Sequence, residues 1–406
     1  MEKPHVLYLS RNGLLEPLGQ SQILSYLKPL SAHYRFHIVS FEKERDLNNT
    51  DHYNHIAAVC RDHNIAWTPL TYGSAPRGLG VLTGFFQLFR TGLGIQRQRQ
   101  VSMIHARSYY PAFVALAIRR LTGTPFLFDM RALWAEELVV AGRLKPGTIP
   151  HRMVKDLEKR CLIASGAVIS LTQAAANHLI ATYPNAHLQQ KLVVIPTCTD
   201  TDRFATKGPI PPSPDREIVL SCFGALLSGW FKIGVLAAVI DYLLREHPNV
   251  RIAILTRDDE EEVHSHLDPD RKYANRISIG SAPFAEMPQR MQAYHGTMFF
   301  YEADISRLGS FPTRMGESLS VGLPVLCNPC VSDVRTIVEQ HGVGVILEEY
   351  TPAAIKTACD AFLQLLEEPD IVSRCRAVAE EFFSLESGVA RYAASYRTVL
   401  SSTTPS

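Results

Sequence analysis

The sequence lacks any long apolar run and any marked excess of charge of one sign. No stretch reaches the roughly 18 to 20 consecutive apolar residues that span a bilayer, and no charged leader followed by an apolar segment opens the chain. The 41 lysines and arginines nearly balance the 40 aspartates and glutamates, and the net charge of +1 argues against nucleic acid as the main ligand. We therefore expect a soluble, cytoplasmic protein.

Metal-binding and disulfide patterns are also missing. The eight cysteines are scattered through predicted strands and helices, so most should be small buried apolar side chains. Cys327-Asn-Pro-Cys330 is a lone CxxC, and a zinc site would need two further ligands. Asp268-Pro-Asp270 has the spacing of a metal-binding DxD motif but lies in a charged segment that no predicted strand leads into. We therefore expect no metal and no cofactor.

The glycine fingerprint of dinucleotide-binding enzymes does not occur either. The two GxG pairs, Gly78-Leu-Gly80 and Gly92-Leu-Gly94, do not follow a predicted strand, as the GxGxxG motif requires. The sequence therefore disfavours a dehydrogenase.

What the sequence does contain is an alternation of strands and helices in both of its halves. A length of 406 residues exceeds one typical domain, and 46% hydrophobic residues can supply large cores. A proline-dense segment at residues 209–214 is the best candidate for a linker. We predict an α/β protein with two doubly wound, Rossmann-like domains facing a cleft, at residues 1–205 and 206–385.

Residues 309–324 predict a helix that starts just after a strand at residues 297–301. Ser310 can cap this helix, and Pro312 is tolerated in its first turn because the missing N–H would be unpaired there. The free backbone N–H groups and the positive end of the helix dipole suit a diphosphate. Glu317 follows Thr313 by four residues, so it lies on the same face of the helix about 6 Å further along the axis. Its carboxylate can accept hydrogen bonds from sugar hydroxyls there. The alternative is an ordinary strand–helix–strand unit with a solvated glutamate.

Polar side chains follow two neighbouring predicted strands, at residues 101–105 and 125–129. They are His105 and Arg107 after the first strand, and Asp129, Arg131, Trp134 and Glu136 at the end of the second. Because ligands of open α/β sheets bind beyond the carboxyl ends of the strands, these residues predict one wall of a site. The alternative is a structural network in which Asp129 pairs with Arg131 or Arg107.

Two loops after predicted strands carry further candidates. Gly19 lies at the entrance of a helix predicted for residues 19–33, where a glycine lets the backbone approach a ligand closely. Gly224 opens a loop that ends at Lys232. A lysine about 4 Å from a phosphate would contribute at most ~4 kcal/mol at an effective dielectric constant near 20. The alternative for Lys232 is a solvated residue at a helix start.

The helix predicted for residues 79–99 combines apolar residues with Arg90, Arg97 and Arg99. We favour a crossover helix of a strand–helix–strand unit. Binding to an anionic membrane surface is the alternative, and it would place the protein at the inner face of the plasma membrane.

Several of these segments resemble retaining glycosyltransferases of family 4, which have the GT-B fold, and in particular a bacterial polysaccharide-synthesis branch. The resemblance is strongest at residues 309–334 and 126–137, and it extends to residues 12–22, 192–204 and 342–344. It implies that the donor is held by Gly19, Gly224, Lys232, Ser310, Phe311, Pro312, Thr313 and Glu317, with the helix-start amides on the diphosphate and Glu317 on the ribose. It also implies that a last helix, within residues 386–406, crosses back to the first domain.

Three positions depart from the pattern of that family. Gly309 stands where the family has a glutamate that contacts the donor sugar, and Ala225 stands where it has an arginine. Asp129 stands where many members have a histidine.

The resemblance implies an enzyme that transfers a sugar from a nucleoside-diphosphate sugar, with a UDP-sugar as the expected donor, to a polysaccharide or lipid-linked saccharide. It implies retention of anomeric configuration and no requirement for metal. The catalytic candidates are Asp129, Arg131 and Lys232, and the acceptor-side candidates are His105, Arg107, Trp134 and Glu136. Expected partners are the nucleotide sugar, the acceptor and a peripheral contact with membrane, without nucleic acid. The alternatives are a non-catalytic or altered nucleotide-sugar-binding protein and a GT-B-like nucleotide-sugar epimerase.

Overall fold

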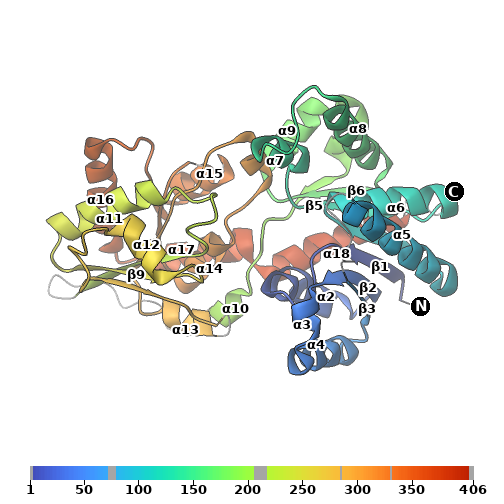
Figure 1. Cartoon of the computed structure of the whole chain (residues 1–406), viewed down its shortest axis with the longest axis horizontal. Helices are drawn as coiled ribbons and strands as arrows, with labels where there is room; N and C mark the ends of the chain where they lie inside the picture. The colour runs from blue at the N-terminus through green and yellow to red at the C-terminus, as the bar shows by residue number, and fades with distance from the viewer. Residues whose placement is uncertain (1–2, 72–78, 205–216, 284–285, 330–331, 402–406) are drawn as a thin grey trace. The chain divides into compact units, whose positions relative to one another are not determined.

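The structure is a computed structural model that describes residues 3–71, 79–204, 217–283, 286–329 and 332–401 (Figure 1). The chain forms two compact units. Unit 1 contains Met1–Pro196, Leu308–Ser310 and Leu385–Ser406, and unit 2 contains Thr197–Arg307 and Phe311–Ser384. The proline-dense segment at 209–214 lies outside the described residues.

Unit 1 is built on a parallel sheet with the strand order β3-β2-β1-β4-β5-β6-β7. This order reverses direction at β1, as in doubly wound folds, so β1 and β4 flank the point where ligands bind such sheets. The strands are β1 (His5–Ser10), β2 (Arg35–Glu42), β3 (Ala66–Thr71), β4 (Met103–Arg107), β5 (Phe126–Met130), β6 (Ala167–Ser170) and β7 (Leu192–Val194).

Helices of unit 1 connect these strands and cover the sheet. They are α1 (Pro17–Gly19), the π-helical turn η1 (Gln20–Leu24), α2 (Ser25–Leu30), α3 (Glu44–Leu47), α4 (Thr50–Asp62), α5 (Leu79–Arg99), α6 (Tyr109–Thr122), α7 (Trp134–Val140), α8 (Ile149–Ala164), α9 (Gln173–Thr182), the 3-10 turns η2 (Pro184–Ala186) and η3 (Leu188–Gln190), and α18 (Leu385–Ser401). The last of these, α18, packs against β5, β6 and α2.

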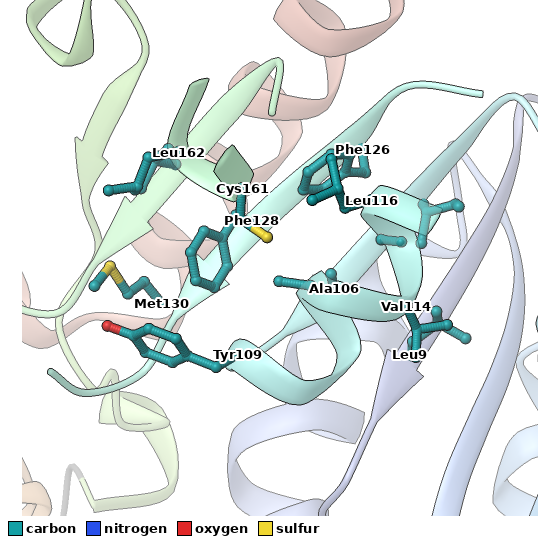
Figure 2. Close-up of a cluster of buried hydrophobic side chains, with 14 of the residues drawn as sticks. Leu9, Ala106, Tyr109, Val114, Leu116, Phe126, Phe128, Met130, Cys161 and Leu162 are labelled. Carbon is teal, nitrogen blue, oxygen red and sulfur yellow. The ribbon is translucent and has the colours of Figure 1, made fainter. Parts of the chain in front are cut away.

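Alternation along the strands separates the two faces of this sheet, because successive side chains of a strand point to opposite sides. Leu7 and Leu9 belong to the core under α5 and α6, whereas Tyr8 contacts His105 on the other face, with ring centroids 4.2 Å apart. Figure 2 shows part of the first core, in which Phe128 and Tyr109 meet edge to face at 5.3 Å. Aromatic pairs of this kind add stabilisation beyond the apolar area that they bury.

Unit 2 is built on a second parallel sheet with the order β10-β9-β8-β11-β12-β13. The strands are β8 (Ile218–Phe223), β9 (Val250–Leu255), β10 (Ile277–Gly280), β11 (Gly296–Phe299), β12 (Val325–Cys327) and β13 (Gly344–Ile346). The helices are α10 (Thr201–Phe204), α11 (Ile233–Glu246), α12 (Glu260–Leu267), α13 (Met287–Met291), the 3-10 turn η5 (Ile305–Gly309), whose last two residues belong to unit 1, α14 (Thr313–Val321), α15 (Ser332–His341), α16 (Pro352–Leu366) and α17 (Ile371–Phe383). The predicted α/β fold with two doubly wound parallel sheets is confirmed.

Some local predictions differ from the structure. The helix predicted for residues 19–33 is interrupted by η1 and ends at Leu30, with Pro29, which has no N–H to donate, in its last turn. We predicted a helix over residues 284–295. Residues 284–285 lie outside the described residues, and the structure has the shorter α13 because the His295 N–H donates to the Val219 carbonyl of β8. Unit 1 ends at Pro196 rather than at residue 205, because Phe204 packs in the core of unit 2.

Candidate functional site

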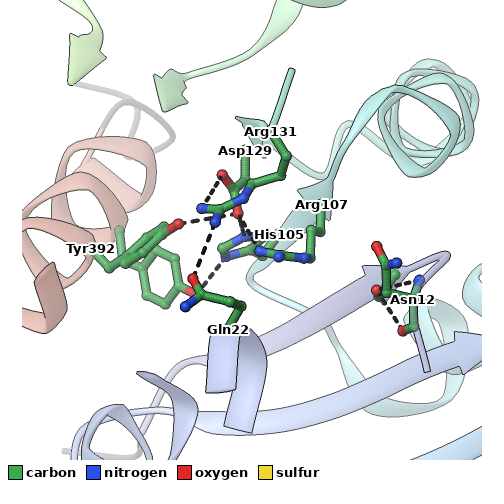
Figure 3. A network of polar contacts seen from close by, with 9 residues as sticks. Asn12, Gln22, His105, Arg107, Asp129, Arg131 and Tyr392 are labelled. Atoms are coloured by element: carbon green, nitrogen blue, oxygen red, sulfur yellow. Dashed lines mark hydrogen bonds and ion pairs between the residues drawn. The ribbon is translucent and has the colours of Figure 1, made fainter. Parts of the chain in front are cut away.

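A buried ionic network lies at the carboxyl ends of β4 and β5. The register places Arg107 opposite Asp129, and Arg107 Nη1 lies 3.4 Å from Asp129 Oδ2. His105 Nε2 is 3.3 Å from the same oxygen, and Arg131 Nη1 is 3.6 Å from Asp129 Oδ1. Figure 3 shows these groups converging on the carboxylate, which has no exposed surface.

The C-terminal helix α18 completes this network. Tyr392 donates a hydrogen bond of 3.1 Å to Asp129 Oδ2, and the Tyr396 hydroxyl lies 2.7 Å from His105 Nδ1. Burial raises the pKa of both tyrosines well above the ordinary value, so both remain hydrogen-bond donors. His105 therefore accepts from Tyr396 and donates to Asp129, and burial lowers its pKa, which keeps the ring neutral.

The charge of Asp129 is secured by its partners. Burial by itself would raise the pKa of Asp129, but Arg131, His105 and Arg107 outweigh burial and hold that pKa well below its usual range. The carboxylate is therefore ionised and already occupied by side chains of unit 1. This geometry corresponds to the alternative of a structural network, which ties α18 to the end of the sheet. Arg131 also donates to Gln22, at 3.3 Å.

The loop after β1 is organised by a carboxylate that the sequence did not single out. Glu42, at the end of β2, accepts hydrogen bonds from the backbone N–H groups of Leu14 and Leu15, at 2.8 and 3.1 Å. Gly19 is needed because a Cβ there would collide with the carbonyl of Gly13. The close approach that we predicted for Gly19 is thus made to this loop's own backbone. In the sequence, Glu42 looks like an ordinary charged residue at the end of a strand, so no local signal identifies it.

A second buried carboxylate of unit 1 is that of Glu158 in α8. Tyr109 donates to its Oε2 at 2.6 Å, and Tyr183 and Lys155 both bind its Oε1, the lysine at 2.5 Å. Lys155 also bridges to Glu136 at 3.0 Å, so the predicted acceptor-side residue Glu136 belongs to this cluster. The cluster joins α8 to the start of α6 and was missed because its members are far apart in the sequence.

A cavity of about 300 Å³ opens beyond the carboxyl ends of β1, β2 and β4, within unit 1. Its lining residues are Arg11, Asn12, Glu16, Lys43, Ser108, Tyr109, Tyr110 and Trp134. Ser108, which directly precedes α6, has φ 71° and ψ 178°, a conformation that is nearly restricted to glycine. Such backbone strain concentrates at binding and catalytic sites, at a cost of about 1–3 kcal/mol. Of the four predicted acceptor-side residues, the cavity includes Trp134.

In unit 2, α14 follows β11 in the chain, after the turn η5. Pro312 occupies the position before its first residue, and no side chain of the described residues caps the helix, so the predicted cap by Ser310 is wrong. Thr313 opens the helix, and Phe311 packs on Phe383 with ring centroids 5.1 Å apart. Backbone N–H groups at an uncapped helix start remain available to an anion.

Glu317 is 4% exposed on α14 and forms an ion pair of 2.5 Å with Arg314 one turn earlier. The arginine holds Oε2 of the carboxylate. This contact fixes the orientation of Glu317, so the alternative of a freely solvated glutamate does not apply.

The loop at residues 224–232 brings Lys232 to the start of α11. Gly224 has φ 124°, which an L side chain rarely adopts, so glycine is required there. Lys232 pairs with Glu302 at 2.7 Å, and its ammonium lies 5.4 Å from the centre of the Tyr350 ring. The hydrogen bond to Glu302 is the main cause of the raised pKa of Lys232. The lysine is therefore cationic and partnered.

The space around Gly309 explains why a glycine stands where the family has a glutamate. In unit 1, a Cβ at this position would lie 2.6 Å from the backbone nitrogen of Leu133. The preceding residue, Leu308, accepts a hydrogen bond from the Thr172 hydroxyl. A glutamate side chain has no room beside Leu133 unless the backbone moves.

The weak metal signals have structural explanations. The Asp268 carboxylate accepts hydrogen bonds from the backbone N–H groups of Lys272 and Tyr273, at 2.9 and 2.7 Å, and so stabilises a turn. Cys327 is buried in β12, and Cys330 lies outside the described residues. Within the described part of the chain, no three His, Cys, Asp or Glu side chains are grouped so as to hold a metal ion. Among the same residues, no helix has the length and hydropathy to cross a bilayer.

Comparison with known proteins identifies the class of the protein. Residues 23–198 match the family model described as a glycosyl transferase 4-like domain. The matched residues make up most of the first segment of unit 1. No curated protein matches the sequence.

Several solved structures have a fold similar to that of this chain over nearly its whole length. HepE from Anabaena, in complex with UDP and glucose, has a TM-score of 0.66 at 18% identity and covers 97% of this chain and 99% of its own. Sucrose-phosphate synthase from Thermosynechococcus elongatus has a TM-score of 0.73 at 15% identity, over 99% and 100%. A putative UDP-N-acetylglucosamine 2-epimerase from Listeria monocytogenes has a TM-score of 0.61 at 11% identity, over 99% and 98%. The fold is the GT-B fold, and the prediction of a glycosyltransferase is confirmed.

Proposed function

We propose that this glycosyltransferase moves a sugar from a UDP-sugar to a saccharide acceptor, either a polysaccharide or a lipid-linked saccharide. The observation that supports this best is the uncapped start of α14, followed by the oriented carboxylate of Glu317. The fold is shared with HepE, which was solved with UDP and glucose.

In this proposal the donor diphosphate lies against the first backbone N–H groups of α14, those of Thr313 and Arg314. Fixed N–H dipoles stabilise the charge that grows on the leaving diphosphate without having to reorganise during the reaction. Lys232 adds a positive charge when it exchanges Glu302 for a phosphate oxygen. At about 4 Å this is worth at most ~4 kcal/mol, and only the part gained in the transition state accelerates transfer. These groups can neutralise the leaving group without a metal ion, and we propose metal-independent transfer with retention of configuration.

Glu317 recognises the ribose. Arg314 holds Oε2, and the remaining oxygen, Oε1, accepts hydrogen bonds from the sugar hydroxyls. A hydrogen bond to a charged acceptor contributes about 1.5–3 kcal/mol.

The acceptor binds in the 300 Å³ cavity of unit 1. Trp134 and Tyr110 supply flat apolar faces, while Arg11, Asn12 and Ser108 supply polar groups around it. This combination suits a saccharide, which presents both C–H faces and hydroxyls. In the same proposal Asp129 and Arg131 are positioning residues rather than catalytic ones, because they hold α18 and η1 at the site.

Calorimetric titration of UDP tests the donor site. Glu317→Gln, which keeps the shape of the side chain, should weaken UDP binding by about 10- to 100-fold, in line with the loss of one charged hydrogen bond. Glu339→Ala is the matched control, because Glu339 lies on an exposed face of α15 in the same unit. The proposal fails if UDP, GDP and ADP all show no binding at about millimolar concentration, or if Glu317→Gln leaves the affinity unchanged.

A second experiment separates transfer from the two alternative functions. One structure with a similar fold is described as a putative epimerase. The fold alone therefore does not distinguish a glycosyltransferase from a nucleotide-sugar epimerase. Radiolabelled UDP-sugars are incubated with and without a lipid-linked acceptor. Label in the acceptor supports the proposal, a changed nucleotide sugar indicates an epimerase, and an unchanged one indicates a binding protein.

A further inference from the structure

A second and larger cavity, of about 700 Å³, opens in unit 1 at the other ends of the sheet strands. Its lining residues are Lys3, His5, Ser31, Tyr34, Arg35, Phe36, Asn64, Ala66, Gln98 and Arg99. His5, Arg35 and Ala66 are the first residues of β1, β2 and β3. The cavity therefore lies at the amino ends of the strands, whereas Asp129 and Ser108 lie at the carboxyl ends. Its volume is within the range of small-molecule sites.

The lining of this cavity carries positive charge from three separate segments. Lys3 precedes β1, Arg35 begins β2 and Arg99 ends α5, and no Asp or Glu occurs among the lining residues. Two of these segments are fixed to each other by a bond of 3.1 Å between His5 Nδ1 and the Arg99 carbonyl. Lys3 Nζ donates to the Ser31 carbonyl at 3.1 Å. These contacts hold the segments that carry Lys3 and Arg99 at the same cavity.

Beside the cavity lies a buried nitrogen that has no hydrogen-bond partner in the described part of the chain. His37 is 7% exposed, and its ring stacks on that of His5, with centroids 6.5 Å apart. Its Nε2 lies 2.8 Å from the Thr68 hydroxyl, but no described residue forms a hydrogen bond with its Nδ1. Burial, and after it Arg99 and His5, lower the pKa of His37 to about 4.

We propose that this cavity binds the phosphate group of a small anionic molecule, at a site separate from donor and acceptor. Lys3 and Arg99 contact the phosphate oxygens, since charge-assisted hydrogen bonds from lysine and arginine to phosphate are short and strong. Asn64, Gln98 and the His5 ring offer further polar contacts at the rim.

A ligand in this cavity would also stabilise the packing of the C-terminal helix α18. Tyr34, which lines the cavity, packs edge to face on Tyr396 of α18 at 5.0 Å, and its hydroxyl lies 3.4 Å from the Ala393 carbonyl. A molecule that fills the cavity holds Tyr34 in place and so stabilises the attachment of α18 to unit 1. Because it binds the folded state, it should also raise the melting temperature.

Calorimetric titration of inorganic pyrophosphate into the full-length protein tests the site. Saturating UDP is included so that the donor site does not contribute. Wild type should bind pyrophosphate, and the double variant Lys3→Gln/Arg99→Gln should bind it at least about tenfold more weakly, because two charge-assisted contacts are lost. Arg97→Gln is the matched control, since Arg97 is an exposed residue of α5 that does not line the cavity.

The same proteins are then mixed with vesicles of phosphatidylglycerol or of phosphatidylcholine. Binding to the anionic vesicles alone, lost in the double variant and kept in Arg97→Gln, assigns the phosphate to a lipid headgroup. Equal affinity of wild type and double variant for pyrophosphate, or no binding of either probe to wild type, overturns the proposal. UDP binding of the double variant is measured in parallel, so a failure of the donor proposal is recognised separately.

Discussion

Replacing Asp129 by asparagine tests whether the buried network is structural or catalytic. The substitution keeps the size of the side chain but removes the negative charge between Arg107 and Arg131, at 3.4 and 3.6 Å. Breaking a buried ion pair by removing one partner costs about 3–5 kcal/mol, because the remaining charge is left buried without compensation. For a domain of roughly 150–250 residues, each kcal/mol lowers the melting temperature by about 2–4 °C. We therefore expect a decrease of about 6–20 °C.

Differential scanning calorimetry measures this change, and Asp156→Asn serves as the control. Asp156 pairs with Arg160 on an exposed face of α8, and its loss should change the stability by no more than about 0.5 kcal/mol. UDP binding and sugar transfer are assayed at a temperature at which both variants are folded. A melting temperature that stays unchanged in Asp129→Asn while transfer is abolished would refute the structural role and restore the catalytic one.

The same carboxylate gives a pH dependence with a defined sign. Because the pKa of Asp129 is held well below its usual range in the folded protein, its contribution is fully present above the unfolded value near 3.9. That contribution is lost as the pH falls through the lower folded value. Wild type should therefore lose more stability than Asp129→Asn between about pH 5 and pH 2, as measured by denaturant unfolding at several pH values.

Two further substitutions test packing at the site. Tyr183→Phe removes one of the donors to the buried carboxylate of Glu158, so unfolding in urea should show a loss of about 1.5–3 kcal/mol, and no loss would mean that Lys155 and Tyr109 suffice. Gly309→Ala should destabilise unit 1 in a thermal melt because its Cβ would meet the Leu133 backbone at 2.6 Å. Gly94→Ala in α5, where a Cβ meets nothing within 4 Å, should be neutral or stabilising by about 0.5–1 kcal/mol. Equal melting temperatures for these two glycine variants would show that the loop at Gly309 moves freely.

The candidate site shows where reasoning from sequence is effective. Residues 79–99 were predicted as a helix with the bounds that α5 has, because apolar periodicity is a local property of the chain. Helix capping is another such local contact: at the start of α9 the Thr172 hydroxyl accepts a hydrogen bond from the Ala175 N–H at 3.1 Å. The start of α14 after β11 follows from the same kind of local pattern, even though the helix has no side-chain cap.

Contacts between distant segments were beyond that reasoning. Nothing near Asp129 in the sequence indicates that Tyr392, 263 positions away, donates a hydrogen bond to it. The same holds for Glu42, which organises a loop some 28 residues earlier, and for Glu158, which gathers donors from α6, α8 and the end of α9. Each of these carboxylates looks like an ordinary charged residue until folding removes its water and supplies its partners.

The order of strands and helices, the two parallel sheets and the placement of polar residues at strand ends were determined by the sequence itself, since hydrophobic periodicity and turn residues act over a few positions. Tertiary structure alone decided which of those polar residues are enclosed and paired, as at Asp129, and which line a cavity, as at Ser108 and Trp134. The physical reason is that burial and charge pairing depend on groups brought together through space, and a carboxylate changes its role with the number of donors around it.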